Sequence, residues 1–291
     1  MVKELLLGDN PFIGVSHLAQ EKAREEQREA TLENKVRVIE AAIVGGATGF
    51  TFSTHPANLE LLQYIRDKHR DLLLKLNYYI LVPYAAKYVR EATSVGTAQL
   101  IKKIIASTIR LKNLGLLLQP KPINFIKLFL ETELEEYLRV LPKENVKAVL
   151  LHEVLTELLT AFNLDDIVKE LAEHFRKQGI GFGLESRNIV KVKQLLEGNG
   201  MTVDYLMTPM NPLGYQMTPA REEAEKTIVE LSAMGIRMIA INVFASGAIK
   251  PQKAAVYLTK LRQHIYAITI GTSKPQRALE NFRLFKGLLA L

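Results

Sequence analysis

Eight short apolar runs recur along the chain, and most of them are separated by stretches with the pattern of amphipathic helices. Each run has the length and composition of a strand that is buried on both faces. Strands that alternate with helices indicate parallel strands joined by helical crossovers. Eight such strands fit a closed (β/α)8 TIM barrel, an α/β fold, better than an open sheet. The expected strands cover residues 3–10, 49–55, 72–79, 147–153, 180–186, 203–211, 237–244 and 267–273.

The chain is expected to form a single TIM-barrel domain of residues 1–291, because no linker-like or low-complexity segment divides it. The third and fourth expected strands are separated by an unusually long stretch, about residues 80–145. It contains two segments with broad apolar faces, residues 94–115 and 122–141. We interpret this stretch as a helical insertion that either covers the barrel mouth or provides the contact of a homo-oligomer.

Charge and composition narrow the classes of partner. The net charge is +7, but Lys and Arg are scattered among Asp and Glu, and no dense basic tract contains interleaved aromatics. A nucleic-acid partner is therefore not expected, whereas a basic pocket for an anionic small molecule stays open. No apolar run reaches the roughly 18 residues of a membrane span, and the start lacks the apolar core of a signal peptide. The absence of cysteine fits a cytoplasmic protein.

Polar residues follow the expected strands at the ends that would converge on the barrel mouth, where this fold places its chemistry. Some polarity is expected there in any case, because strand ends meet solvent. No HxH or HExxH spacing occurs, so no metal site is expected. The candidates for a substrate pocket are Asp9, Asn10, Asn77, Glu185 and Asn242.

Lys75 and His152 are the two candidates with the most specific chemistry. Lys75 interrupts an apolar run, so it either points to solvent at a strand edge or is an active-site lysine that polarises an acid or forms a Schiff base. His152 ends another run, as a structural cap or as a proton-transfer group. Since they would end adjacent strands, we expect them to face each other across the mouth.

The stretch of residues 265–282 combines a buried strand, a Gly-Thr-Ser turn and a helix that begins at a proline. Free backbone N–H groups and the helix dipole make such a turn favourable for an anion. Ser273, Lys274 and Arg277 would add donors and positive charge. The alternative is that Ser273 caps the helix while the basic side chains are solvated.

The last third of the chain resembles the aldo-keto reductase superfamily, in residues 181–196, 203–214, 234–249 and 268–282. The resemblance implies a TIM barrel and an NADP cofactor. It implies that Ser186 and Asn211 contact the cofactor, with Ser186 at the nicotinamide amide. It assigns the 2′-phosphate to Ser273, Lys274 and Arg277, and the adenine to Asn281.

The first half agrees with the same family in part. Lys75 and His152 match the lysine and histidine of its catalytic tetrad, whereas Thr51 and Pro56 stand at the places of the aspartate and tyrosine. Other departures follow at the cofactor-contacting positions. Ile241 replaces an aromatic residue that stacks on the nicotinamide, and Met207 replaces a glutamine that contacts it.

Three functions remain open on these patterns. The first is an NADP-dependent carbonyl oxidoreductase in which His55 or a tyrosine just past Lys75, Tyr78 or Tyr79, replaces the proton donor. The second is a lyase or isomerase that uses Lys75 on a phosphorylated or carbonyl substrate. The third is a non-catalytic relative that binds a nucleotide. All three imply a small-molecule ligand, with an anion as one candidate.

Overall fold

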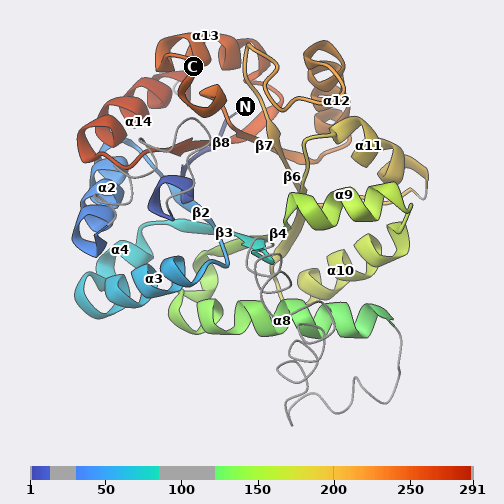
Figure 1. The fold of residues 1–291 in the computed structure, drawn as a ribbon, viewed down its shortest axis with the longest axis horizontal. Helices are drawn as coiled ribbons and strands as arrows, with labels where there is room; N and C mark the ends of the chain where they lie inside the picture. The colour runs from blue at the N-terminus through green and yellow to red at the C-terminus, as the bar shows by residue number, and fades with distance from the viewer. Residues whose placement is uncertain (1, 14–30, 85–121, 199, 290–291) are drawn as a thin grey trace, which may run out of the picture.

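A computed structural model describes residues 2–13, 31–84, 122–198 and 200–289. Its strands are all parallel and close into a barrel in chain order, so the predicted (β/α)8 barrel is confirmed (Figure 1). The strands are β1 (Glu4–Gly8), β2 (Gly49–Ser53), β3 (Asn77–Val82), β4 (Val146–Leu151), β5 (Gly181–Glu185), β6 (Tyr205–Pro209), β7 (Arg237–Ile241) and β8 (Ile265–Gly271).

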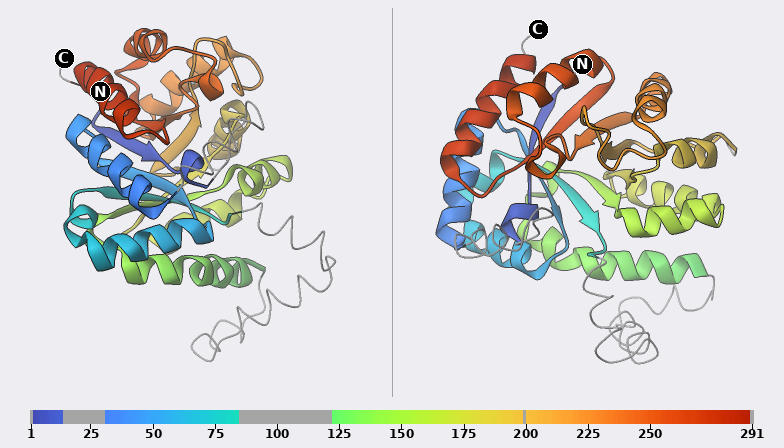
Figure 2. Two further views of the ribbon diagram at one scale, coloured as in Figure 1. Left: turned by 60° about the vertical axis from the view of Figure 1, so that its left-hand side comes forward. Right: turned by 45° about the horizontal axis from the view of Figure 1, so that its top comes forward.

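Helices surround the strands, as both views of Figure 2 show. The last helix packs beside the first described one, which closes the ring where the chain begins and ends (Figure 1). No helix of the described residues is both long and apolar enough to cross a membrane. The helices are α2 (Leu32–Gly45), α3 (Pro56–Lys68), α4 (Arg70–Leu74), α8 (Pro122–Val140), α9 (Glu153–Ala161), α10 (Asp165–Lys177), α11 (Ile189–Gly198), α12 (Arg221–Ala233), α13 (Pro251–Leu261) and α14 (Pro275–Leu289), with 3-10 turns η1 (Asn10–Phe12), η3 (Lys143–Asn145) and η4 (Ala245–Gly247).

The strands are apolar because both of their faces are buried. Leu6, Leu150 and Met207 belong to a cluster inside the barrel, whereas Leu7 and Phe52 pack in the layer between the strands and the helices. Each fully buried side chain of this size contributes roughly 1.5–3 kcal/mol to folding. The two layers explain why the strands appear in the sequence as continuous apolar runs.

A polar cluster closes the amino end of the barrel. Glu4 accepts hydrogen bonds from the hydroxyls of Tyr79 at 2.9 Å and Tyr266 at 3.0 Å, and from the amide of Asn77 at 3.1 Å. The ring of Tyr205 packs edge-on against both of these tyrosines. Because side chains fill this end, the barrel is a packed core, and its opposite end is left for chemistry.

The third strand differs from its prediction. Residues 72–74 belong to the short helix α4, Lys75 is its C-cap, and β3 begins only at Asn77. Leu72 and Leu73 are buried as helix residues, and a short apolar run does not distinguish a buried helix turn from a strand.

The predicted insertion of about residues 80–145 divides into two parts. The helix α8 contacts α3 and α10 in the outer ring, so it is the ordinary crossover between β3 and β4. Residues 85–121 lie outside the described ranges, as does most of the stretch proposed for a homo-oligomer contact. That residues 1–291 form a single domain stays a prediction.

Candidate functional site

The barrel mouth lies at the carboxyl ends of the strands, the end from which Figure 1 is seen. Four polar side chains follow strands there: Asp9 after β1, Ser53 at the end of β2, His152 after β4 and Glu185 at the end of β5. Each side chain is placed by the strand before it, so the rigid barrel fixes the geometry of the cluster.

Asp9 is buried and held by two neighbouring elements. One carboxylate oxygen accepts hydrogen bonds from the backbone N–H of Ser53 at 2.9 Å, from the Ser53 hydroxyl at 2.8 Å and from the Asn58 amide at 2.7 Å. Burial raises the pKa of Asp9, and the hydrogen bonds from Ser53 and Asn58 oppose that shift. The Asp9 carboxyl, just past β1, is thereby fixed against the end of β2.

Glu185 has the electrostatic environment of a proton-transfer group. Burial is the largest cause that raises the pKa of its carboxyl to about 8, and the charges of Glu153 and Asp9 add to the shift. The backbone N–H of Glu153, at 3.1 Å, and the charge of Arg187 oppose it. With this pKa the carboxyl exists in both protonation states near neutral pH, so it can donate or accept a proton.

Arg187 and Glu153 form a bidentate ion pair next to Glu185. The Nε atom of Arg187 donates to Oε2 of Glu153 at 2.6 Å, and Nη2 donates to Oε1 at 2.5 Å. The fork geometry fixes both side chains more firmly than a single contact would. The pair therefore holds one negative and one positive charge at defined places beside the Glu185 carboxyl.

His152 is the N-cap of α9. Its Nδ1 accepts a hydrogen bond from the backbone N–H of Val154 at 3.3 Å, so the neutral ring carries its proton on Nε2. Burial lowers the pKa of His152, and the charge of Arg187 lowers it further, while Glu153 raises it. At neutral pH the imidazole is therefore an uncharged hydrogen-bond donor.

The prediction that Lys75 and His152 face each other across the mouth is wrong. Lys75 is exposed and precedes β3 at the amino end of the barrel, whereas His152 follows the carboxyl end of β4. Asn77 and Tyr78 also lie at the amino end. The Asn77 amide donates to Glu4 in the polar cluster that closes this end. Tyr78 is buried, and its hydroxyl donates to the backbone carbonyl of Leu73 at 2.9 Å.

Three further predicted site residues lie at the mouth. His55 caps α3, its Nδ1 accepts from the Ala57 N–H at 3.0 Å, and its ring meets Tyr84 edge-on at 4.6 Å. Asn10 is exposed in η1. The amide of Asn242, just past β7, donates to Gln216 at 2.5 Å.

Ser186 and Asn211 are fully buried and already hydrogen-bonded, Ser186 to a residue of α9 and to its own loop, and Asn211 within its own loop. The Ser186 hydroxyl donates to Glu157 at 2.7 Å and accepts from the Asn188 N–H at 2.9 Å. The Asn211 side chain bonds both backbone groups of Tyr215 at 2.9 Å. Both side chains thus shape the loops after β5 and β6.

The turn after β8 has the strand–turn–helix form that its sequence predicts. Thr272 accepts from the backbone N–H of Lys274 at 3.3 Å, and α14 begins at the next residue. Ser273 is buried, with its carbonyl bound to Asn34 at 3.1 Å. Arg277 is exposed in the first turn of α14, and the half-buried Asn281 lies four residues further along.

Sequence reasoning missed Asn58, which binds Asp9, and Arg187, which lies beside Glu185. Each lies in or just before the first turn of a helix that follows a mouth-ending strand, which was the available signal. It also missed Glu157 in α9, which accepts hydrogen bonds from Ser186 and from the backbone of Arg187. Within the described ranges no group of three or more His, Cys, Asp or Glu residues could hold a metal ion.

The ionisable cluster lies at the end of the (β/α)8 barrel where enzymes of this fold place their active sites. No family model and no curated protein matches this sequence. The solved structures that are similar to it include a protein of Pseudomonas aeruginosa described as an aldo-keto reductase, 13% identical, with a TM-score of 0.60 over 99% of this chain and 91% of that one. A glycerol dehydrogenase of Gluconobacter oxydans is 12% identical, with a TM-score of 0.55 over 99% and 92% of the two chains.

A third similar structure is a substituted form of Gox0644 in complex with NADPH. It is 13% identical, with a TM-score of 0.51 over 88% of this chain and 80% of that one. At these identities the likeness establishes the fold. The barrel of this chain is similar to that of the aldo-keto reductases along almost its whole length.

Proposed function

We propose that this protein is a carbonyl oxidoreductase of the aldo-keto reductase type, with a nicotinamide cofactor and with Glu185 as its proton donor and acceptor. The observation that carries the proposal is the carboxyl of Glu185, whose pKa is raised to about 8 at the mouth of this barrel. The fold it shares with aldo-keto reductases, and with a solved structure in complex with NADPH, supports the choice of reaction.

The residues present fit the phosphate end of NADP better than the nicotinamide end. The turn after β8 offers the start of α14, and Lys274 and Arg277 lie there with it. The side chains of Ser186 and Asn211 are engaged in hydrogen bonds within the protein, so another group would hold the nicotinamide amide. When bound, the cofactor would supply the hydride that a carbonyl carbon accepts.

The protein's own residues would move the proton. The protonated carboxyl of Glu185 donates to the substrate oxygen as it becomes an alcohol, and the carboxylate accepts a proton in the reverse direction. The positive charge of Arg187 favours the carboxylate that forms. The Nε2–H group of His152 donates a hydrogen bond that orients the same oxygen. General acid catalysis of this kind contributes roughly 10²- to 10⁴-fold in rate.

The lyase or isomerase predicted as an alternative from the sequence loses support at Lys75. A lyase or isomerase that uses this lysine would need it at the mouth, and it lies at the other end of the barrel. Tyr78 is equally remote, because its hydroxyl is buried against Leu73. His55 stays at the mouth, but its Nδ1 is occupied by the cap of α3.

Cofactor binding and turnover test the proposal together. Calorimetric titration of NADPH and NADH should show binding, and Arg277→Ala should weaken NADPH about tenfold while leaving NADH unchanged, because a charge-assisted contact contributes roughly 1.5–3 kcal/mol. Arg283→Ala, an exposed arginine further along α14, is the matched control. Glu185→Gln should reduce turnover of an aldehyde at least 100-fold without changing cofactor affinity.

Two results would contradict this function. If neither cofactor binds at millimolar concentration, the protein is not a nicotinamide-dependent oxidoreductase. If the cofactors bind and Glu185→Gln turns over at the wild-type rate, Glu185 is not the proton donor.

A further inference from the structure

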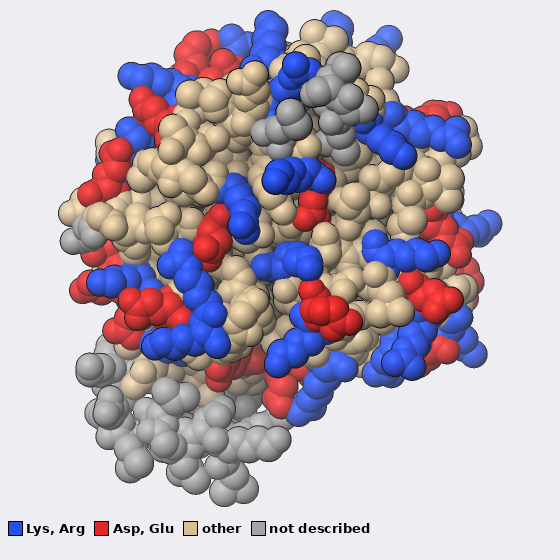
Figure 3. Space-filling model, turned by 180° about the vertical axis from the view of Figure 1, so that it is seen from behind, with Lys and Arg blue, Asp and Glu red and all other residues tan. Residues whose placement is uncertain are grey.

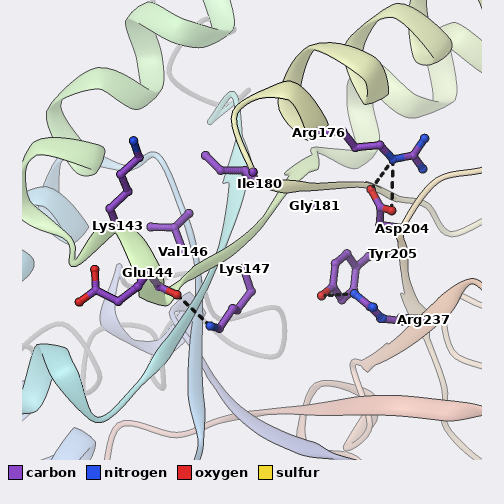
Figure 4. A pocket seen from close by; sticks show the side chains of 11 residues that line it. Lys143, Glu144, Val146, Lys147, Arg176, Ile180, Gly181, Asp204, Tyr205 and Arg237 are labelled. Carbon is purple, nitrogen blue, oxygen red and sulfur yellow. Dashed lines mark hydrogen bonds and ion pairs between the residues drawn. The ribbon is translucent and has the colours of Figure 1, made fainter.

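A pocket lies at the amino ends of β4 to β7. This end of the barrel is opposite to the mouth and belongs to the face seen in Figure 3. Its volume is about 440 Å³, which is within the range of small-molecule sites. Figure 4 shows cationic side chains on both sides of it. The charged residues that line the pocket are Lys143, Glu144, Lys147, Arg176, Asp204 and Arg237.

One of the cations is already neutralised. The Nε atom of Arg176 donates to both carboxylate oxygens of Asp204, at 3.2 and 3.0 Å, and Nη2 donates to the carbonyl of Thr202 at 3.1 Å. Asp204 also accepts from the backbone N–H of Phe182 at 2.9 Å. This pair forms one wall of the pocket and adds no net charge.

The other three cations have no carboxylate within ion-pair distance among the described residues. The ammonium of Lys147 donates to the backbone carbonyl of Glu144 at 2.8 Å, while the Glu144 carboxylate points away from it (Figure 4). Arg237 donates to the Tyr205 hydroxyl at 2.8 Å, and its guanidinium lies over the rings of Tyr205 and Tyr266 at 5.1 and 5.6 Å. Arg237 is thus oriented by hydrogen bonds and ring contacts to neutral groups, while Asp204 acts on it through charge without forming an ion pair.

We propose that this pocket binds a small anion that carries phosphate groups. Phosphate oxygens accept several charge-assisted hydrogen bonds at once, which suits the ammonium groups of Lys143 and Lys147 on one side and the guanidinium of Arg237 on the other. A ligand bound there would be separated from the mouth by the barrel interior. The site therefore belongs to a different face from the turn after β8, and it does not depend on the reaction proposed above.

Titration of the full chain with pyrophosphate, by calorimetry at constant ionic strength, tests the proposal. Lys147→Gln and Arg237→Gln should each weaken pyrophosphate binding about tenfold, and the double variant should abolish it. Lys253→Gln at the start of α13 removes the same charge from an exposed site remote from the pocket, and it should bind as the wild type does. Thermal melting of each variant checks that it folds, and Lys143→Gln provides a second test position, at an exposed residue that lines the pocket.

The turn after β8 is a competing anion site, so Arg277→Gln separates the two. Binding that persists in Arg277→Gln and is lost in Lys147→Gln supports the pocket. The proposal is overturned if pyrophosphate fails to bind at millimolar concentration. It is overturned equally if only Arg277→Gln loses binding, or if Lys253→Gln weakens binding as much as Lys147→Gln does.

Discussion

At the scale of single residues, Glu185 has, besides Asp9, two charged neighbours that act on its pKa in opposite directions. Glu153 raises the pKa through its negative charge, and Arg187 lowers it through its positive charge. Because the two neighbours are bound to each other at 2.5 and 2.6 Å, neither moves independently. Together they contribute to the pH at which the Glu185 carboxyl changes its protonation state.

This arrangement predicts that removing the charge of Glu153 and removing that of Arg187 shift the pKa of Glu185 in opposite directions. Glu153→Gln removes a repulsive charge and leaves Arg187 without its partner, so the pKa of Glu185 should fall below about 8. Arg187→Gln should raise it above that value. A carboxyl titration by ¹³C NMR measures both, with Glu173→Gln on the exposed face of α10 as the control. Shifts in the same direction would show that the pair acts through packing rather than charge.

The residue scale also shows what sequence could and could not supply. Asp9, His152 and Glu185 were predicted at the mouth because each directly follows or ends an apolar strand. Their partners were not predicted, since a sequence does not say which side chain of a neighbouring βα unit reaches across. Asn58, for example, binds Asp9 from a helix 49 residues further along the chain.

At the scale of elements, the outer ring of helices closes where α2 packs on α14. A Cβ atom on Gly45 would lie 2.7 Å from Cβ of Phe282 and 3.0 Å from the carbonyl oxygen of Leu279. Neither atom is the end of a flexible side chain, so a larger residue must separate the two helices. Phe282 is fully buried, and any separation opens space around it.

Gly45→Ala should therefore destabilise the fold by about 1–3 kcal/mol, the usual cost of overpacking. Gly287→Ala in α14 is the matched control. Nothing lies within 4 Å of its added Cβ, so the better helix propensity of alanine should stabilise by up to about 1 kcal/mol. Urea denaturation measures both changes. A Gly45→Ala variant as stable as Gly287→Ala would mean that the helices do not meet as closely as described.

The element scale also separates reliable from unreliable sequence signals. Seven strands were predicted close to their observed bounds, because each is an isolated apolar run next to a turn signal. The third failed because the buried leucines of α4 lie directly before β3, and the two segments, with Lys75 between them, were interpreted as one strand. Because of that single error, Lys75 and Tyr78, half of the predicted catalytic residues, were placed at the wrong end of the barrel.

At the scale of the whole molecule, the barrel separates two ends with different chemistry. At the amino end, Glu4 accepts hydrogen bonds from three neutral donors, so the polar cluster there closes the barrel structurally. The mouth contains Asp9 and Glu185, whose pKa values are raised by burial, and His152, whose pKa is lowered by it. Burial thus disfavours the charged form of all three groups. Their contribution to the free energy of unfolding therefore depends on pH.

The directions of these pKa shifts predict how stability changes with pH. Between its ordinary pKa of 4.5 and the raised value of about 8, folded Glu185 retains a proton that the unfolded chain has lost. Its contribution therefore lowers stability as pH rises through this window. His152 acts in the other sense, because the unfolded chain binds its proton more tightly, but only below about pH 6.5. Above that pH the fall caused by Glu185 is no longer offset by His152.

The melting temperature of the wild type should accordingly decrease between pH 6.5 and 8.5, and that of Glu185→Gln should decrease less. The stability gained by the variant at pH 8.5, relative to pH 5, should be on the order of 3 kcal/mol. One pKa unit corresponds to about 1.4 kcal/mol, and access of solvent to the half-buried carboxyl reduces the full difference. Glu173→Gln again serves as the control, since that carboxylate is exposed. Parallel curves for the wild type and Glu185→Gln would show that Glu185 ionises in the folded protein as readily as in the unfolded chain, and the proton-transfer role proposed for it would then lack its physical basis.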